Sequence, residues 1–288
     1  MPLDLPEKKY SSSLTFQYDG DFIHYEKIGE GEKSLVFLHG FAMSLHAWDD
    51  IRDKFPMKRY TLYLVDLKGC GFSSKLNEGD YSLARQCGIL YAWMQSLFIH
   101  SPVIIGHSYG GLVALAFYYH LRKKKWDISP SKLILLDAPA YPEHIPVFLK
   151  LLKNPLLGYI SLKMVSPGWN AKLIIRMTFF HHEEAVHRLY DRYRFFLELE
   201  GTDDAMLLMA KQVIPDDLDE MVKSYKDIDI PVLVLWGEND ELIPLKYGKK
   251  LAADIPHASL QLIPECGHVP HEECPDDTYT RIMAFLEA

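Results

Sequence analysis

The sequence has few cysteines, no surplus of positive charge and no long apolar stretch. Four cysteines in 288 residues are too few for a disulfide scaffold, and none is spaced as CxxC. The 31 Lys and Arg are outnumbered by 39 Asp and Glu, giving a formal charge of -8, which argues against nucleic acid as a partner. No uncharged apolar run reaches the roughly 18 residues of a membrane-spanning helix, so we expect no stable membrane insertion.

The amino terminus lacks the features of a secretory signal. Acidic residues and prolines occur in MPLDLPEKKYSSS, where such a signal would have a basic start and then an apolar run. Together with the sparse cysteines, this predicts a cytoplasmic protein with reduced thiols.

The overall composition is that of a globular protein. Hydrophobic residues make up 48% and charged residues 24% of the chain, which argues against a disordered or fibrous protein. A length of 288 residues fits either two units or one large core with an insertion.

Eight segments have the pattern of β-strands. Two alternating runs, LTFQY from Leu14 and FIHYEKIG from Phe22, surround an Asp-Gly turn and predict an antiparallel hairpin. Six nearly continuous apolar runs follow, as expected for strands covered on both faces; they begin at Ser34, Tyr60, Ser101, Ser131, Pro231 and Ala258. Helical spacing between them, over residues 83–98, 110–121, 245–253 and 277–286, predicts an α/β fold with a mostly parallel eight-stranded sheet flanked by helices.

The alternation of strands and helices stops between residues 139 and 229. This stretch has amphipathic helical patterns and no convincing strand. We therefore expect a core formed by residues 1–138 and 230–288, with a helical cap of residues 139–229 inserted after the sixth strand.

A GxSxG motif occurs at Gly106-His107-Ser108-Tyr109-Gly110. An apolar strand precedes it and a helical pattern follows, which is the context in which a sharp turn exposes a serine hydroxyl as a nucleophile. Glycines at 106 and 110 leave room for that turn. The motif thus predicts that Ser108 is a catalytic nucleophile.

Four separated motifs resemble the α/β-hydrolase superfamily, specifically its capped single-domain serine esterases. The motifs are HisGlyPheAla from His39, AspLeuLysGlyCysGlyPheSer from Asp66, GlyHisSerTyrGlyGly from Gly106 and GlyHisValProHisGlu from Gly267. The resemblance implies that His268 is the general base. It also implies an oxyanion hole formed by the backbone N–H groups of Phe41 and Tyr109.

The acid that orients the base has two candidates. Asp240 follows the strand that begins at Pro231, where the family usually carries the acid, and the 28 residues before His268 accommodate one helix and one strand. Asp137 ends the preceding strand, where some members carry it instead. We favour Asp240 and keep Asp137 as the alternative.

The expected reaction is hydrolysis of a carboxylic ester through an acyl-enzyme, without cofactor or metal. Small to medium apolar acyl groups are expected because the cap is rich in aliphatic and aromatic residues. We predict that Phe41, His107, Phe148 and Leu152 bind this small-molecule ester. A homodimer is left open.

Four alternatives share some of these sequence features. A carbon-carbon bond hydrolase usually has a tryptophan soon after the base, whereas Val269 and Pro270 follow here. A lipase or monoacylglycerol hydrolase would use the same triad, and a slow or non-catalytic ligand receptor would have the same fold. A zinc site at Cys266, His268, His271 and Cys274 is disfavoured because the spacing does not match known zinc motifs.

Overall fold

The computed structural model describes residues 13–76 and 78–288. Within them, eight strands form one sheet in the order β1-β2-β4-β3-β5-β6-β7-β8. The strands are β1 (Ser13–Tyr18), β2 (Asp21–Ile28), β3 (Lys33–Leu38), β4 (Tyr60–Val65), β5 (Val103–His107), β6 (Lys132–Leu136), β7 (Val232–Gly237) and β8 (Ala258–Ile263). The hairpin β1–β2 and the pair β2–β4 are antiparallel and all other pairs are parallel, which confirms the predicted sheet.

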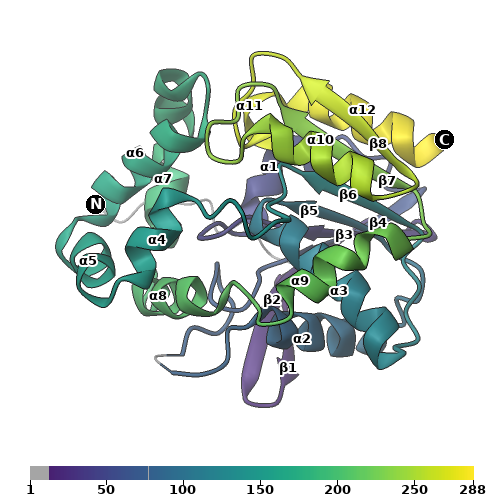
Figure 1. Cartoon of the computed structure of the whole chain (residues 1–288), viewed down its shortest axis with the longest axis horizontal. Helices are drawn as coiled ribbons and strands as arrows, with labels where there is room; N and C mark the ends of the chain where they lie inside the picture. The colour runs from purple at the N-terminus through teal and green to yellow at the C-terminus, as the bar shows by residue number, and fades with distance from the viewer. Residues whose placement is uncertain (1–12, 77) are drawn as a thin grey trace.

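Helices cover both faces of this sheet (Figure 1). Alternate side chains of β3 explain why, since Val36 and Leu38 belong to one apolar cluster and Leu35 and Phe37 to another. The first cluster includes residues of α2 (Leu83–Ser96), α3 (Tyr109–Lys124) and α10 (Leu245–Asp254). The second includes residues of η2 (Leu45–Trp48), α1 (Asp49–Arg52) and α12 (Pro275–Glu287). The continuous apolar runs are therefore strands buried on both sides.

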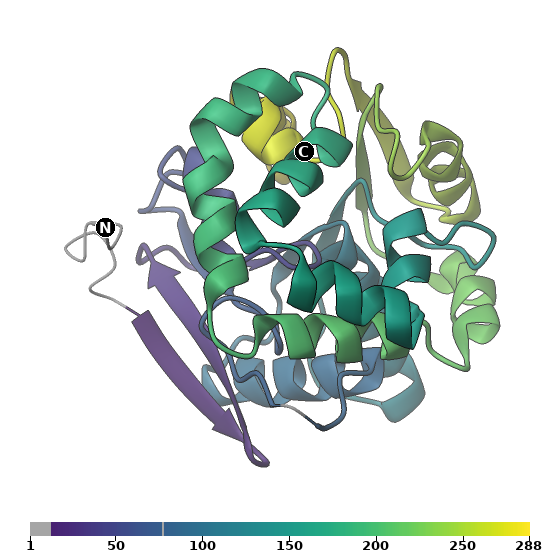
Figure 2. The ribbon, with the colours of Figure 1, turned by 90° about the vertical axis from the view of Figure 1, so that its left-hand side faces the viewer.

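The stretch from β6 to β7, every residue of which is described, contains helices and no strand. Its helices are α4 (Val147–Lys153), α5 (Pro155–Tyr159), η3 (Ile160–Met164), α6 (Pro167–Thr178), α7 (His182–Glu198), α8 (Thr202–Gln212), α9 (Leu218–Lys223) and η4 (Tyr225–Asp227). We call α4 to α8, residues 147–212, the cap helices. They lie together on one side of the sheet in both ribbon views (Figures 1 and 2).

The last part of this stretch packs against the core, as Ala205 and Met209 of α8 also do. Met221 in α9 and Tyr225 in η4 are buried in the same apolar cluster as α3, and the Tyr225 hydroxyl donates to the Ala140 carbonyl at 2.9 Å. The boundaries predicted for a separate cap, residues 139 and 229, therefore remain a prediction. Among the described helices, none is both long and apolar enough to cross a membrane.

Candidate active site

Ser108 stands at the turn between β5 and α3. Its backbone has φ 49° and ψ -119°, a strained combination for a residue with a side chain. A Cβ at Gly106 would lie 2.4 Å from the Gly110 carbonyl oxygen, and one at Gly110 would lie 2.1 Å from that of Leu38. The two glycines therefore allow the sharp turn that holds the Ser108 hydroxyl at the carboxyl end of the strands.

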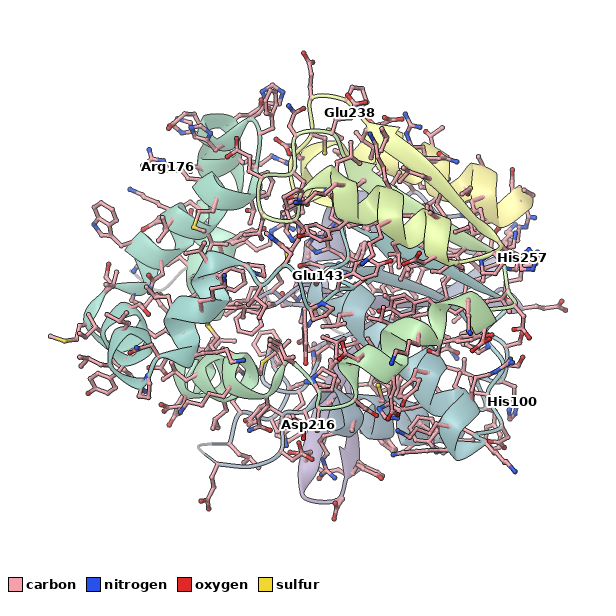
Figure 3. All side chains as sticks on the ribbon, viewed as in Figure 1. His100, Glu143, Arg176, Asp216, Glu238 and His257 are labelled. Carbon is pink, nitrogen blue, oxygen red and sulfur yellow. The ribbon has the colours of Figure 1, made fainter. Side chains whose placement is uncertain are left out.

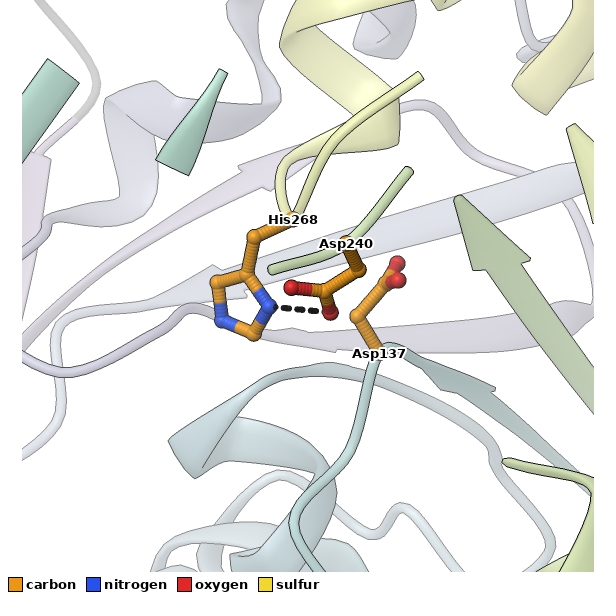
Figure 4. Close-up of side chains that lie close together, drawn as sticks. All are labelled: Asp137, Asp240 and His268. Atoms are coloured by element: carbon orange, nitrogen blue, oxygen red, sulfur yellow. Dashed lines mark hydrogen bonds and ion pairs between the residues drawn. The ribbon is translucent and has the colours of Figure 1, made fainter. Parts of the chain in front are cut away.

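His268 and Asp240 meet Ser108 from distant parts of the chain. The Ser108 Oγ is 2.8 Å from His268 Nε2, and His268 Nδ1 is 2.8 Å from Asp240 Oδ2 (Figure 4). Asp240 Oδ1 accepts hydrogen bonds from the backbone N–H groups of Leu242 and Ile243, at 2.8 and 2.9 Å. This arrangement can move the serine proton to His268 while Asp240 keeps the Nδ1–H oriented.

Asp137, the alternative acid, lies beside Asp240 at the end of β6 and makes no hydrogen bond to His268 (Figure 4). It is fully buried, and one carboxyl oxygen accepts from the Gly237 N–H at 2.9 Å. The other oxygen has no hydrogen-bond partner among the described residues. Burial, followed by the neighbouring charge of Asp240, raises the pKa of Asp137 well above its usual range.

One group of described residues has the compactness of a metal site. Ligand atoms of Asp137, Asp240 and His268 lie within 4.8 Å of one another. A cation there would displace the hydrogen bond between His268 and Asp240. The residues disfavoured above as a zinc site, Cys266, His268, His271 and Cys274, do not form such a group in the described part of the chain.

The loop after β3 lies against the start of α3. A Cβ on Gly40 would be 2.9 Å from His107 Nδ1, so this loop approaches the turn closely. The rings of Phe41 and Tyr109 are in edge contact, with centroids 6.2 Å apart. The structure thus brings together the two residues whose backbone N–H groups are predicted to form the oxyanion hole.

His39 and His107 support this loop and the His268 loop. His39 Nδ1 is 2.8 Å from the Gly40 carbonyl oxygen, and its Nε2 accepts from the Leu67 N–H at 3.0 Å. His107 Nε2 is 2.8 Å from the His268 carbonyl oxygen. Burial lowers the pKa of both rings, so both are neutral and act as hydrogen-bonding braces.

Two cavities meet at Ser108. The larger, about 140 Å³, lies between the sheet and the cap helices and is bordered by all four residues predicted to bind substrate, Phe41, His107, Phe148 and Leu152. The smaller, about 60 Å³, reaches toward Tyr141 and α9. Phe41 and Phe148 border both cavities, and their ring centroids are 5.7 Å apart. This aromatic pair therefore lies between two mostly apolar cavities, and Ser108 borders both of them.

The contacts that join the cap to the loop around His268 were not predicted from the sequence. The His268 N–H donates to the Thr178 carbonyl at 2.7 Å. Glu273 accepts from the Gly267 N–H and, with its other oxygen, from the His181 N–H, both at 2.6 Å. The only signal in the sequence is the acidic pair Glu272-Glu273, shortly after His268. This pair alone does not identify the groups that it contacts.

A second contact joins α7 to α11 (Pro270–Glu273), the short helix after His268. Tyr193 donates to Glu272 at 2.6 Å, Arg192 lies 3.5 Å from the other Glu272 oxygen, and Arg188 donates to the Glu272 carbonyl. Burial raises the pKa of Glu272 to about 7. The cap is thus tied to the segment that follows the predicted base.

Comparisons with known sequences identify similar proteins. The family model described as "Alpha/beta hydrolase family" matches residues 35–281. The uncharacterized hydrolase YugF of Bacillus subtilis is 27% identical over 94% of this chain and 97% of its own length. Lipase 3 of a Moraxella species is 26% identical over 96% and 84%. A 2-hydroxy-6-oxononadienedioate/2-hydroxy-6-oxononatrienedioate hydrolase of Pseudomonas putida is 26% identical over 98% of both chains.

Solved structures show the same fold. A thermophilic esterase of Thermogutta terrifontis aligns with a TM-score of 0.77 at 24% identity, covering 96% of this chain and 98% of the other. A meta-cleavage product hydrolase of Pseudomonas fluorescens aligns with a TM-score of 0.78 at 19% identity, covering 95% and 97%. At such identities the likeness concerns the fold alone.

Proposed function

The chain belongs to the alpha/beta hydrolase family, and on this premise we propose that it is a serine hydrolase cleaving carboxylic esters of small to medium apolar acyl groups. The contact of the Ser108 hydroxyl with His268, itself bonded to Asp240, carries this proposal. Relatives that are named lipases and an esterase of the same fold support the coarser statement that it is a hydrolase.

In the first half-reaction, the Ser108 hydroxyl attacks the ester carbonyl carbon while its proton moves to His268 Nε2. Asp240 stabilises the imidazolium through Nδ1–H. The carbonyl oxygen becomes an oxyanion that accepts from the Phe41 and Tyr109 N–H groups. The tetrahedral intermediate then expels the alcohol, which takes the proton from His268, and an acyl-Ser108 ester remains.

The second half-reaction repeats these steps with water. A water molecule gives a proton to His268 Nε2 as its oxygen attacks the acyl-Ser108 carbonyl. The new intermediate collapses to the carboxylic acid, and the departing Ser108 oxygen takes the proton back from His268. Asp240 is the acid in this mechanism, because the imidazole is hydrogen-bonded to Asp240 and makes no bond to Asp137.

The two cavities suggest how the ester is held. The larger cavity, bordered by Phe148 and Leu152, has the apolar lining that an acyl chain requires. The smaller cavity, on the other side of Phe41, then receives the alcohol. Each cavity is small, which favours esters of limited size on both sides of the carbonyl.

A carbon-carbon bond hydrolase is the second candidate. The Pseudomonas putida relative is named as a 2-hydroxy-6-oxononadienedioate/2-hydroxy-6-oxononatrienedioate hydrolase, and Ser108, Asp240 and His268 could catalyse that reaction too. A panel of p-nitrophenyl esters and 2-hydroxy-6-oxo-dienoates separates the two. Faster turnover of the dienoates would replace the ester proposal. Binding of ligands without turnover of either class would favour a receptor.

Labelling with a fluorophosphonate probe, followed by peptide mapping, tests the nucleophile. We expect the label on Ser108, and Ser108→Ala should lose both the label and ester turnover, with activity falling by more than about 10⁴-fold. Ser161→Ala is the matched control, since Ser161 borders the same cavity but its hydroxyl donates to the Gly158 carbonyl. Label on another residue, or turnover by Ser108→Ala, would refute the proposal.

A further inference from the structure

Exposed apolar side chains are concentrated on one part of the cap. Of the sixteen large hydrophobic side chains that are exposed in the described part of the chain, twelve belong to residues 147–180. Met164 and Trp169 are 73% and 71% exposed. We call residues 147–180 the apolar cap segment. Clusters of this kind mark interaction surfaces on soluble proteins, whereas single exposed apolar residues do not.

The segment is also positively charged, although the whole chain has a formal charge of -8. It contains Lys150, Lys153, Lys163, Lys172 and Arg176 and no acidic residue, although Lys163 pairs with Asp203 and Asp204 of α8 and Arg176 pairs with Glu183 of α7. Within the described residues, neither Lys150 nor Lys172 has a carboxylate partner, so their charge is free to act on an external surface. The combination of exposed apolar side chains with lysines among them is typical of surfaces that contact anionic lipid headgroups.

The location of the segment leaves it accessible. Figure 1 shows α4, α5 and α6 on the side of the molecule away from the sheet. Arg176 projects from the same outer side, whereas His100 and His257 mark the opposite end (Figure 3). Helices α4, α5 and η3 bury only Leu152 and Gly158, and most of their other side chains are exposed.

The segment is continuous with the larger cavity. Leu151, Leu173 and Met177 are exposed at the surface and also border the cavity that reaches Ser108. An apolar molecule held at this surface would therefore have an apolar entrance beside it.

We propose that the apolar cap segment docks on an anionic lipid bilayer, inserting side chains such as Met164 and Trp169 among the headgroups. Delivery of a lipid ester into the cavity from this surface rests on the function proposed above. A second copy of the chain is a poorer occupant, because a symmetric dimer through this face would bring two positively charged surfaces together. The docking is peripheral and involves no membrane-spanning helix.

Vesicle cosedimentation tests the proposal with the full-length Ser108→Ala chain, which keeps binding separate from hydrolysis. We expect binding to vesicles of phosphatidylcholine with phosphatidylserine, and binding weaker by about tenfold or more to phosphatidylcholine alone. Added salt should weaken the binding to the anionic vesicles. Binding that is absent, or equal on both vesicles, would overturn the proposal.

Two double variants locate the surface. Met164→Ser with Trp169→Ser, and Lys150→Glu with Lys172→Glu, should each weaken binding about tenfold. None of these residues borders the cavity, so the same changes in the Ser108 protein should leave the hydrolysis of soluble esters unchanged. Phe98→Ser is the matched control, because Phe98 is 80% exposed and lies outside the segment.

The outcomes separate this proposal from the function. An equal loss of binding in Phe98→Ser would place the effect outside the segment and overturn the proposal. Sedimentation velocity showing a dimer that Trp169→Ser dissociates would assign the face to a second copy and also overturn it. Normal vesicle binding by a chain that hydrolyses no ester would leave the docking surface standing and remove the proposed function.

Discussion

The two walls of the larger cavity are built differently. The sheet side consists of strand ends and tight loops that hold buried, hydrogen-bonded polar groups. His268 is an example, since its two ring nitrogens lie 2.8 Å from Ser108 Oγ and from Asp240 Oδ2. The cap side includes the short helices α4, α5 and η3, which bury few residues and leave apolar side chains at the surface.

The two walls differ because acyl transfer and apolar recognition make different structural demands. Acyl transfer requires the nucleophile, the base and the oxyanion donors to be positioned within fractions of an ångström, and buried hydrogen bonds with few alternatives provide that. Apolar recognition depends on area and shape and tolerates adjustment. A single-atom change on the sheet side should therefore have large effects, and a whole-ring deletion on the cap side should have modest ones.

The largest effect is expected at Asp240. Asp240→Asn leaves the imidazole without its charged partner, so kcat should fall by about 10³- to 10⁴-fold. Asp137→Asn should lower kcat less than about tenfold, because Asp137 makes no bond to the imidazole and the amide oxygen of Asn can still accept from the Gly237 N–H. Steady-state kinetics on a p-nitrophenyl ester measures both, and the reverse order would make Asp137 the acid.

An intermediate effect is expected at Glu272, where the two walls are joined. In the folded chain its pKa is about 7, whereas its ordinary value is 4.5. Between these values the folded state holds a proton that the unfolded state has lost, so this group's contribution to the free energy of unfolding falls as pH rises from about 4.5 to 7. The fall amounts to about 3 kcal/mol.

Glu272→Gln removes that titration while keeping an oxygen that accepts from Tyr193. Denaturant unfolding of the two proteins at several pH values should give a difference that changes by about 3 kcal/mol across this range. Glu143→Gln is the control, because Glu143 is exposed and paired only with Lys250. Parallel pH profiles for the native chain and Glu272→Gln would contradict the expectation.

The smallest effect is expected from Phe148 on the cap side. Phe148→Ala joins the two cavities more openly, so the ratio of kcat/KM for longer to shorter acyl esters should change by about tenfold while kcat for the best ester stays within a few-fold. Leu207→Ala, on α8 outside the cavity lining, is a suitable control. A loss of kcat as large as that of Asp240→Asn would show that the cap wall is as critical to the chemistry as the sheet wall.

Much of the fold could be predicted because its strands are buried on both faces and therefore appear as continuous apolar runs. Residues 103–107 and 232–237 are examples, and the helix expected at 110–121 is found as Tyr109–Lys124. Ser108 was conspicuous because a strained turn requires glycines on both sides. His268 was identified from its motif, and its contact with Ser108 from 160 residues away came only with the structure.

Other features depend on contacts that leave no pattern in the sequence. Asp137 and Asp240 end neighbouring strands, and only the side-chain geometry distinguishes the one that reaches His268. The bond from His181 to Glu273 spans 92 residues and uses a backbone N–H, which any amino acid but proline could supply. Likewise, the packing of α9 with the core is a tertiary preference that its short amphipathic pattern did not reveal.

The order of the site residues along the chain has a consequence for biosynthesis. Translation produces Ser108 first, then the cap helices, then Asp240, and His268 only after β8 has been made. A nascent chain that has folded up to β7 would thus present the serine without any proton acceptor. Under the proposed mechanism, hydrolytic competence appears only when the edge strand β8 has joined β7, so the onset of activity during synthesis or refolding would report completion of the sheet.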